Sequence, residues 1–97
     1  MKSKKTEIEE NIILKIKKLR TDRNISQAAL GSILGISNGL VGNIESPRYQ
    51  HKYTLKQLHT FCTHIDYPFE KLFLTEEELV SDDNIKILIE KIISYDE

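Results

Sequence analysis

The side chains best suited to chemistry in this chain lie close together: two histidines and a cysteine, His59, His64 and Cys62. His59 and His64 are five residues apart, which places them about 140° apart around a helix, so they do not converge on a metal ion. Cys62 shares no helix face with His64 and fits a small core residue better. The chain has no phosphate-binding glycine loop, nucleophile elbow or zinc-ligand pattern. We therefore expect no enzyme activity, no metal and no cofactor.

The cysteine count and the apolar pattern indicate where such a chain works. A single cysteine excludes an internal disulfide framework and fits a reducing compartment. No stretch approaches the roughly 18 apolar residues of a membrane span, and the N-terminal sequence lacks a signal-peptide apolar region. With 97 residues, 39% hydrophobic and 30% charged, the chain has the composition of one small globular domain. We expect a cytoplasmic protein that does not enter a membrane.

Charge is distributed unevenly along the chain. Residues 1–56 carry eleven Lys and Arg against five Asp and Glu, a net charge of +6, and residues 57–97 carry three against ten, a net charge of −7. The two parts sum to the overall charge of −1. This asymmetry favours a basic face on the first part. The alternative is that the charges only solvate the surface.

Aliphatic residues recur at helical spacing through most of the chain, which predicts an all-α fold. A stripe of isoleucines predicts a helix over residues 6–22, after a mobile tail at residues 1–5. Asn24 follows this helix, and asparagine readily takes the left-handed conformation that ends one. Further helices are expected over residues 27–34, 54–65, 68–73 and 82–94.

Residues 37–46, SNGLVGNIES, carry two opposing signals. Asn-Gly favours a tight turn, whereas Val41 and Ile44 keep the period of a helix with one inward face. The stretch begins with a capping serine, Ser37, and follows a short helix that Gly35 ends, so the two form a helix-turn-helix. We expect residues 37–46 to be an intrinsically weak helix that packing holds in place.

The capping serines, glycines and apolar positions of this region resemble the lambda-repressor-like (Xre/Cro-type) helix-turn-helix DNA-binding domain. They read in order Ser26-Gln27, Leu30-Gly31, Leu34-Gly35-Ile36-Ser37, Val41 and Ile44-Glu45. The resemblance covers the chain from about Ile12 to Phe73. It implies a five-helix domain over residues 6–74, followed here by an acidic segment, residues 75–97, with an additional amphipathic helix. Gly31 stands where the family usually has Ala, at the close crossing of the two motif helices.

The resemblance also implies which residues meet DNA bases. They lie in the first two turns of the second motif helix: Asn38, Gly39, Leu40 and Asn43. Asparagine can bond the N6/N7 edge of adenine, and Asn43 lies one turn after Gly39 on the same face. Leu40 would meet a thymine methyl group or the protein's own surface. The alternative for each asparagine is a plain exposed helix residue.

Other residues would position the protein without reading sequence. The resemblance implies phosphate contacts from five of them: Gln27, Ser37, Arg48, Tyr49 and Lys52. It also implies that Gln27 braces the second motif helix. The alternative for Ser37 is capping alone, and for the loop after Glu45 a solvated connector. Arg20 and Glu45 match family positions that form a partly buried ion pair, for which the fork of an arginine is well suited.

The last helix carries an apolar stripe: Ile85, Leu88, Ile89 and Ile92. It either folds back on its own core or pairs with the same helix of a second chain, and we expect dimerisation. The resemblance then implies a sequence-specific transcriptional regulator, favoured as a repressor, that binds a palindromic operator in double-stranded DNA as a homodimer. The alternative is an antitoxin-like or bridging module whose C-terminal helix binds another protein.

Overall fold

Five helices begin at a serine or threonine whose hydroxyl accepts a hydrogen bond from the backbone N–H three residues later: Thr6, Ser26, Ser37, Thr54 and Thr75. The computed structural model describes residues 4–97. Within them lie α1 (Glu7–Asp22), α2 (Gln27–Leu34), α3 (Asn38–Glu45), α4 (Leu55–His64), the 3-10 helix η1 (Phe69–Leu72), α5 (Glu76–Leu79) and α6 (Asn84–Asp96). No strand occurs among these residues, so the predicted all-α fold is confirmed.

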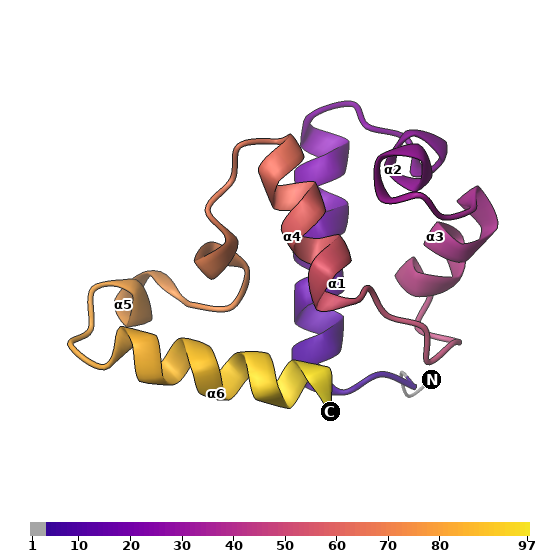
Figure 1. Ribbon diagram of the computed structural model, residues 1–97. Helices are drawn as coiled ribbons and strands as arrows, with labels where there is room; N and C mark the ends of the chain where they lie inside the picture. The colour runs from indigo at the N-terminus through magenta and orange to yellow at the C-terminus, as the bar shows by residue number, and fades with distance from the viewer. Residues whose placement is uncertain (1–3) are drawn as a thin grey trace.

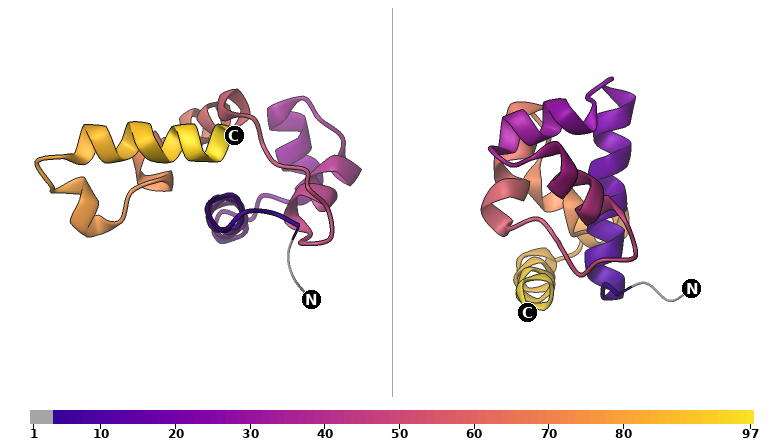
Figure 2. Two further views of the ribbon diagram at one scale, coloured as in Figure 1. Left: turned by 90° about the horizontal axis from the view of Figure 1, so that it is seen from below. Right: turned by 90° about the vertical axis from the view of Figure 1, so that its right-hand side faces the viewer.

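The helices are arranged around α1 (Figure 1). On one side α2 packs against α3 and α4, and α3 contacts α1. On the other side η1 follows α4, and α6 runs along the lower edge of the view with its C-terminal end near the start of α1. The right-hand view of Figure 2 faces the side that carries α2, α3 and the loop after α3.

One apolar core joins these elements. Its buried side chains come from α1, α2, α3, α4, η1, α6 and the connections between them: Ile12, Ile13, Ile16, Leu30, Val41, Ile44, Tyr53, Leu58, Phe61, Cys62, Leu72, Phe73 and Tyr95. The Tyr95 hydroxyl donates to the Tyr53 carbonyl oxygen at 2.7 Å. Burial raises the pKa of the Cys62 thiol to about 11, which keeps it protonated as a core side chain.

The predicted helix ends are largely where the structure has them. Asn24 and Gly35 both adopt left-handed conformations, with φ of 57° and 72°. The segment expected to be a helix at residues 68–73 is instead a 3-10 helix of four residues, Phe69–Leu72, which starts after Pro68 with no side-chain cap. The predicted last helix begins later, at Asn84, and the acidic residues 76–78 form a separate short helix, α5, with its own threonine cap.

The last two residues of the segment expected to be a mobile tail, residues 1–5, make hydrogen bonds to the rest of the fold. The backbone N–H of Lys4 donates to the Pro47 carbonyl oxygen at 3.0 Å. The buried Lys5 ammonium donates to the carbonyl oxygens of Ser46 and, at 2.6 Å, Tyr49. These contacts fasten the segment to the loop after α3. The rest of the predicted tail, residues 1–3, lies outside the described residues.

Among the helices of residues 4–97, none combines the length and the apolar character needed to cross a membrane.

Candidate nucleic-acid interface

The close crossing of α2 and α3 depends on Gly31. A Cβ atom on Gly31 would lie 2.6 Å from the Ile36 carbonyl oxygen, a backbone atom that cannot move aside alone. The backbone N–H groups of Gly35 and Ile36 both donate to the Gly31 carbonyl oxygen, which closes the turn between the helices. Even alanine, the usual family residue, would therefore require this crossing to open.

The helix α3 forms in spite of its Asn-Gly sequence because it is capped and packed. The Ser37 hydroxyl accepts from the Leu40 N–H at 3.0 Å, which is the capping role that was the alternative to a phosphate contact. Val41 and Ile44 are fully buried on the inner face. Packing thus compensates for the roughly 1 kcal/mol that each helical glycine costs.

The outer face of α3 is only partly free. Asn38 and Gly39 are exposed, and Asn43 is half-buried. Leu40 packs against the core, so of its two predicted partners the structure favours the protein's own surface over a thymine methyl group. A Cβ atom on Gly39 would meet only the Ser37 hydroxyl, at 4.0 Å, so no packing contact requires glycine there.

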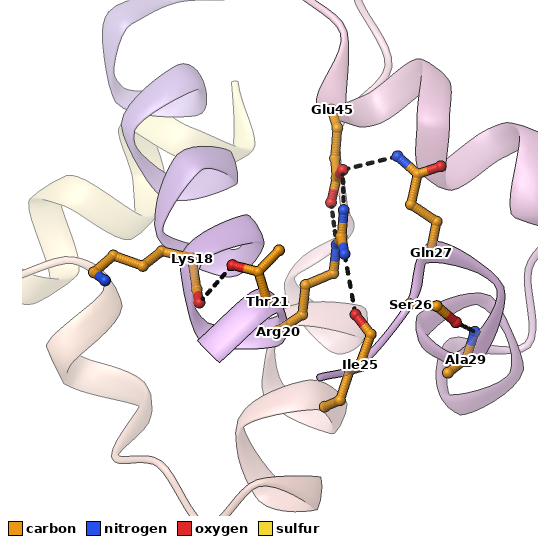
Figure 3. A network of polar contacts seen from close by, with 8 residues as sticks. All are labelled: Lys18, Arg20, Thr21, Ile25, Ser26, Gln27, Ala29 and Glu45. Carbon is orange, nitrogen blue, oxygen red and sulfur yellow. Dashed lines mark hydrogen bonds and ion pairs between the residues drawn. The ribbon is translucent and has the colours of Figure 1, made fainter. Parts of the chain in front are cut away.

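Arg20 and Glu45 form the ion pair that the resemblance implies (Figure 3). Arg20 Nε and one terminal guanidinium nitrogen donate to the two carboxylate oxygens at 2.6 and 2.7 Å. The remaining guanidinium nitrogen donates to the Ile25 carbonyl oxygen at 3.0 Å. The side chains are 9% and 4% exposed. The pair therefore ties the end of α3 to α1 and to the turn before α2.

Gln27 completes this network. Its Nε2 donates to a Glu45 carboxylate oxygen at 3.0 Å (Figure 3). Burial alone would raise the pKa of Glu45, but the hydrogen bonds from Arg20 and Gln27 outweigh it and hold that pKa below its usual value. Gln27 was expected both to contact a phosphate and to brace the second motif helix, and the hydrogen bond from its amide nitrogen to Glu45 at the end of α3 is of the bracing kind.

The loop after α3 presents its polar side chains to solvent. Arg48, Tyr49 and His51 are exposed, and with Lys4 and Gln50 they line a shallow concavity of about 560 Å³. Hydrogen bonds from Lys4 and Lys5 to backbone carbonyl oxygens of residues 46–49 hold this loop in place. Burial lowers the pKa of Lys5, whose ammonium donates to the Ser46 and Tyr49 carbonyl oxygens. Sequence reasoning missed both lysines, because bonds to carbonyl oxygens more than forty residues away leave no local pattern.

Lys52 does not join the exposed cations of this loop. Its ammonium lies 2.8 Å from a Glu9 carboxylate oxygen, donates to the Tyr95 carbonyl oxygen, and sits 4.9 Å from the centre of the Tyr95 ring. A phosphate contact at Lys52, as predicted, would have to compete with these contacts, because its partly buried ammonium is already paired with Glu9. Lys52 instead links α1, the loop and α6.

The predicted dimerisation stripe is divided between two faces of α6. Leu88 and Ile92 pack against the core of their own chain, whereas Ile85 and Ile89 are exposed. The exposed set also includes Ile93, which was not in the prediction. The sequence contains a pattern that could have identified Ile93, because Ile85, Ile89 and Ile93 recur every four residues and so share one helix face.

Carboxylates are nearly absent from the stretch of chain that contains α2 and α3. The chain from Arg23 to Ile65, which contains α2, α3, the loop and α4, has a single acidic residue, Glu45. That carboxylate is buried against Arg20. Over the same stretch Arg23, Arg48 and Lys56 remain exposed. A polyanion approaching α3 would thus meet no exposed carboxylate of this stretch.

Within residues 4–97, the His, Cys, Asp and Glu side chains form no group of three that could hold a metal ion. Comparison of the chain with protein-family models, with curated proteins and with solved structures finds no match, so its function has to be inferred from the contacts and charges described above.

Proposed function

We propose that this protein is a sequence-specific DNA-binding regulator that places α3 in the major groove and acts as a repressor by covering an operator. The observation that carries the proposal is the pairing of an exposed Asn38–Gly39 start of α3 with a surrounding stretch whose only carboxylate is buried. An α-helix fits the width of the major groove, and cations at its edges increase affinity for the phosphate backbone.

Some of the proposed DNA-contacting residues would recognise bases, and others would position the protein on the phosphate backbone. Asn38 and Asn43 are the proposed base contacts, since an amide can pair with the N6/N7 edge of adenine. Gly39 lets the backbone of α3 come close to the groove. Arg48 and Tyr49 are the proposed phosphate contacts from the loop. The Arg20–Glu45–Gln27 network acts indirectly, by fixing the end of α3.

Selection of bound sites from random duplexes tests the proposal. A specific regulator should enrich one sequence, and Asn43→Ala should then relax preference at one base pair, with a loss of about 1–3 kcal/mol of discrimination there. A two-fold symmetric site with half-sites about one DNA turn apart would indicate a bound dimer. Recovery of no enriched sequence, or unchanged preference in both Asn38→Ala and Asn43→Ala, would contradict the assignment of α3.

A second function rests on a different observation, the exposed isoleucines of α6. A protein-interaction module, such as an antitoxin-like or bridging protein, would use them to hold another protein. Purification of the chain alone separates the two functions. A well-folded homodimer favours the regulator, whereas a chain that is stable only when produced with a separate protein favours the module.

A further inference from the structure

The helix α6 has one face in the core and another that nothing in its own chain covers. Tyr95 is fully buried, and Leu88 and Ile92 pack beside it. Turned away from these, Ile85, Ile89 and Ile93 are 69%, 53% and 54% exposed. We call these three residues the isoleucine ridge, because residues four apart lie next to one another along a helix.

Exposed apolar side chains are concentrated at this end of the molecule. Among the described residues the large exposed ones are Leu14, Tyr49, Val80, Ile85, Ile89 and Ile93. Four of the six fall within residues 80–93, since Val80, 85% exposed, lies at the end of α5 just before α6. Single exposed apolar residues are ordinary, but a contiguous group marks an interaction surface.

Two opposite charges run along one flank of the ridge. Lys86 and Glu90 each follow a ridge residue by one position, so they lie on the same side of it. Both are exposed, and neither forms an ion pair with another residue in the part of the chain that the structure describes. By contrast, Lys91 on the inner side is already paired with Glu78 at 2.6 Å.

We propose that the isoleucine ridge pairs with the same ridge of a second copy, with the two α6 helices antiparallel. In a two-fold antiparallel pair the same flanks of the two helices meet, so Lys86 of one copy faces Glu90 of the other, twice. In a parallel pair these side chains would face the other flank, where Leu88 and Ile92 are already packed. Charge complementarity therefore selects the antiparallel arrangement.

The charged residues on the flank indicate the register. With the two-fold axis level with position 88, midway between Lys86 and Glu90, each Lys86 lies level with Glu90 of the second copy, and Ile89 of each copy lies close to the axis.

This inference rests on the proposed function and deepens it by naming the surface through which two copies of the regulator would pair, but its test uses no DNA. Sedimentation equilibrium of the full chain, over a dilution series, should show a monomer–dimer equilibrium. Ile89→Glu should weaken dimerisation at least about tenfold, since it replaces a buried apolar contact by a charge. Leu14→Glu, an equally exposed leucine on α1, is the matched control and should leave the equilibrium unchanged.

A charge exchange tests the arrangement itself. Lys86→Glu and Glu90→Lys should each weaken the dimer about three- to tenfold, and the double variant should restore it. A mixture of the two single variants should form mainly mixed dimers.

A wild-type monomer at all concentrations, or a dimer insensitive to Ile89→Glu, would overturn the ridge as the interface. Failure of the double variant to restore pairing would overturn the antiparallel register. A monomer that still selects a DNA sequence would refute this inference while leaving the proposed function intact.

Discussion

Loss of Glu45 should strongly destabilise the fold, because its carboxylate accepts three hydrogen bonds in a nearly buried position. Removing only one member of the pair leaves the other charge buried without a partner, so Glu45→Met or Arg20→Met should each cost about 3–5 kcal/mol of unfolding free energy. The double variant Arg20→Met/Glu45→Met should lose less than either single variant. Urea titration checks this order, and a double variant worse than both singles would contradict it.

The same carboxylate makes stability depend on pH. The folded-state pKa of Glu45 lies below its value of 4.5 in an unfolded chain, so folding favours the ionised form. The stabilisation is fully present above pH 4.5 and is lost as the pH falls through the lower, folded-state pKa. Urea midpoints measured from pH 6 downward should therefore fall less steeply in the double variant than in wild type. Equal slopes would show that other carboxylates, such as Glu9, account for the acid sensitivity.

Replacing the two basic residues of the loop after α3, Arg48 and Lys52, should have different effects: one should change DNA binding and the other the stability of the fold. Arg48 is exposed, so Arg48→Ala should leave stability unchanged and reduce the slope of log affinity for DNA against log salt by about 1. Lys52 is held by Glu9 and Tyr95, so Lys52→Ala should instead cost about 1–3 kcal/mol of stability. Each variant is the control for the other. If Lys52→Ala changed the salt slope as much as Arg48→Ala at full stability, the internal assignment of Lys52 would fail.

On the scale of elements, local chemistry was sufficient for the capped starts of α1 to α4 and insufficient for the division of residues 68–96 and for the contacts between helices. Ser26, Ser37 and Thr54 cap helices as predicted, because a cap needs only a hydroxyl next to the first turn. The division of the α6 stripe could not be predicted in this way. Isoleucines and leucines cover more than half of its circumference, and only packing against the core decides that Leu88 is turned inward and Ile89 outward.

The two glycines of the helix-turn-helix should respond oppositely to alanine. Gly31→Ala gains about 1 kcal/mol of helix propensity but forces a Cβ atom against the Ile36 carbonyl oxygen, a strain of about 1–3 kcal/mol, so a net loss of stability is expected. Gly39→Ala meets open space and should stabilise α3 by up to about 1 kcal/mol. Thermal unfolding measures both. If Gly39→Ala also tightened DNA binding, close approach of the backbone to the groove could not be the reason for glycine.

For the whole molecule, the structure ties the acidic C-terminal segment to the basic first part. The +6 and −7 halves of the sequence meet where the Lys52 ammonium donates to the Tyr95 carbonyl oxygen, and where the Tyr95 hydroxyl donates to the Tyr53 carbonyl oxygen. The domain boundary expected at residue 75 is thus crossed by contacts of the core itself. Residues 4–97 should behave as one cooperative unit in which α6 supports the loop that follows α3.

Replacing Tyr95 tests this unity. Tyr95→Ala removes a fully buried ring that packs edge-on against Phe73, so it should cost about 3–5 kcal/mol, although the residue lies two positions from the C-terminus. Ile89→Ala, on the exposed side of the same helix, should change the stability of the monomer by less than about 0.5 kcal/mol. In dilute solution, urea unfolding followed by circular dichroism and by amide signals of α2 and α3 should give coincident transitions for wild type. If α6 melted first while α2 and α3 kept their signals, the C-terminal segment would be a separable appendage, and Tyr95→Ala would leave the helix-turn-helix intact.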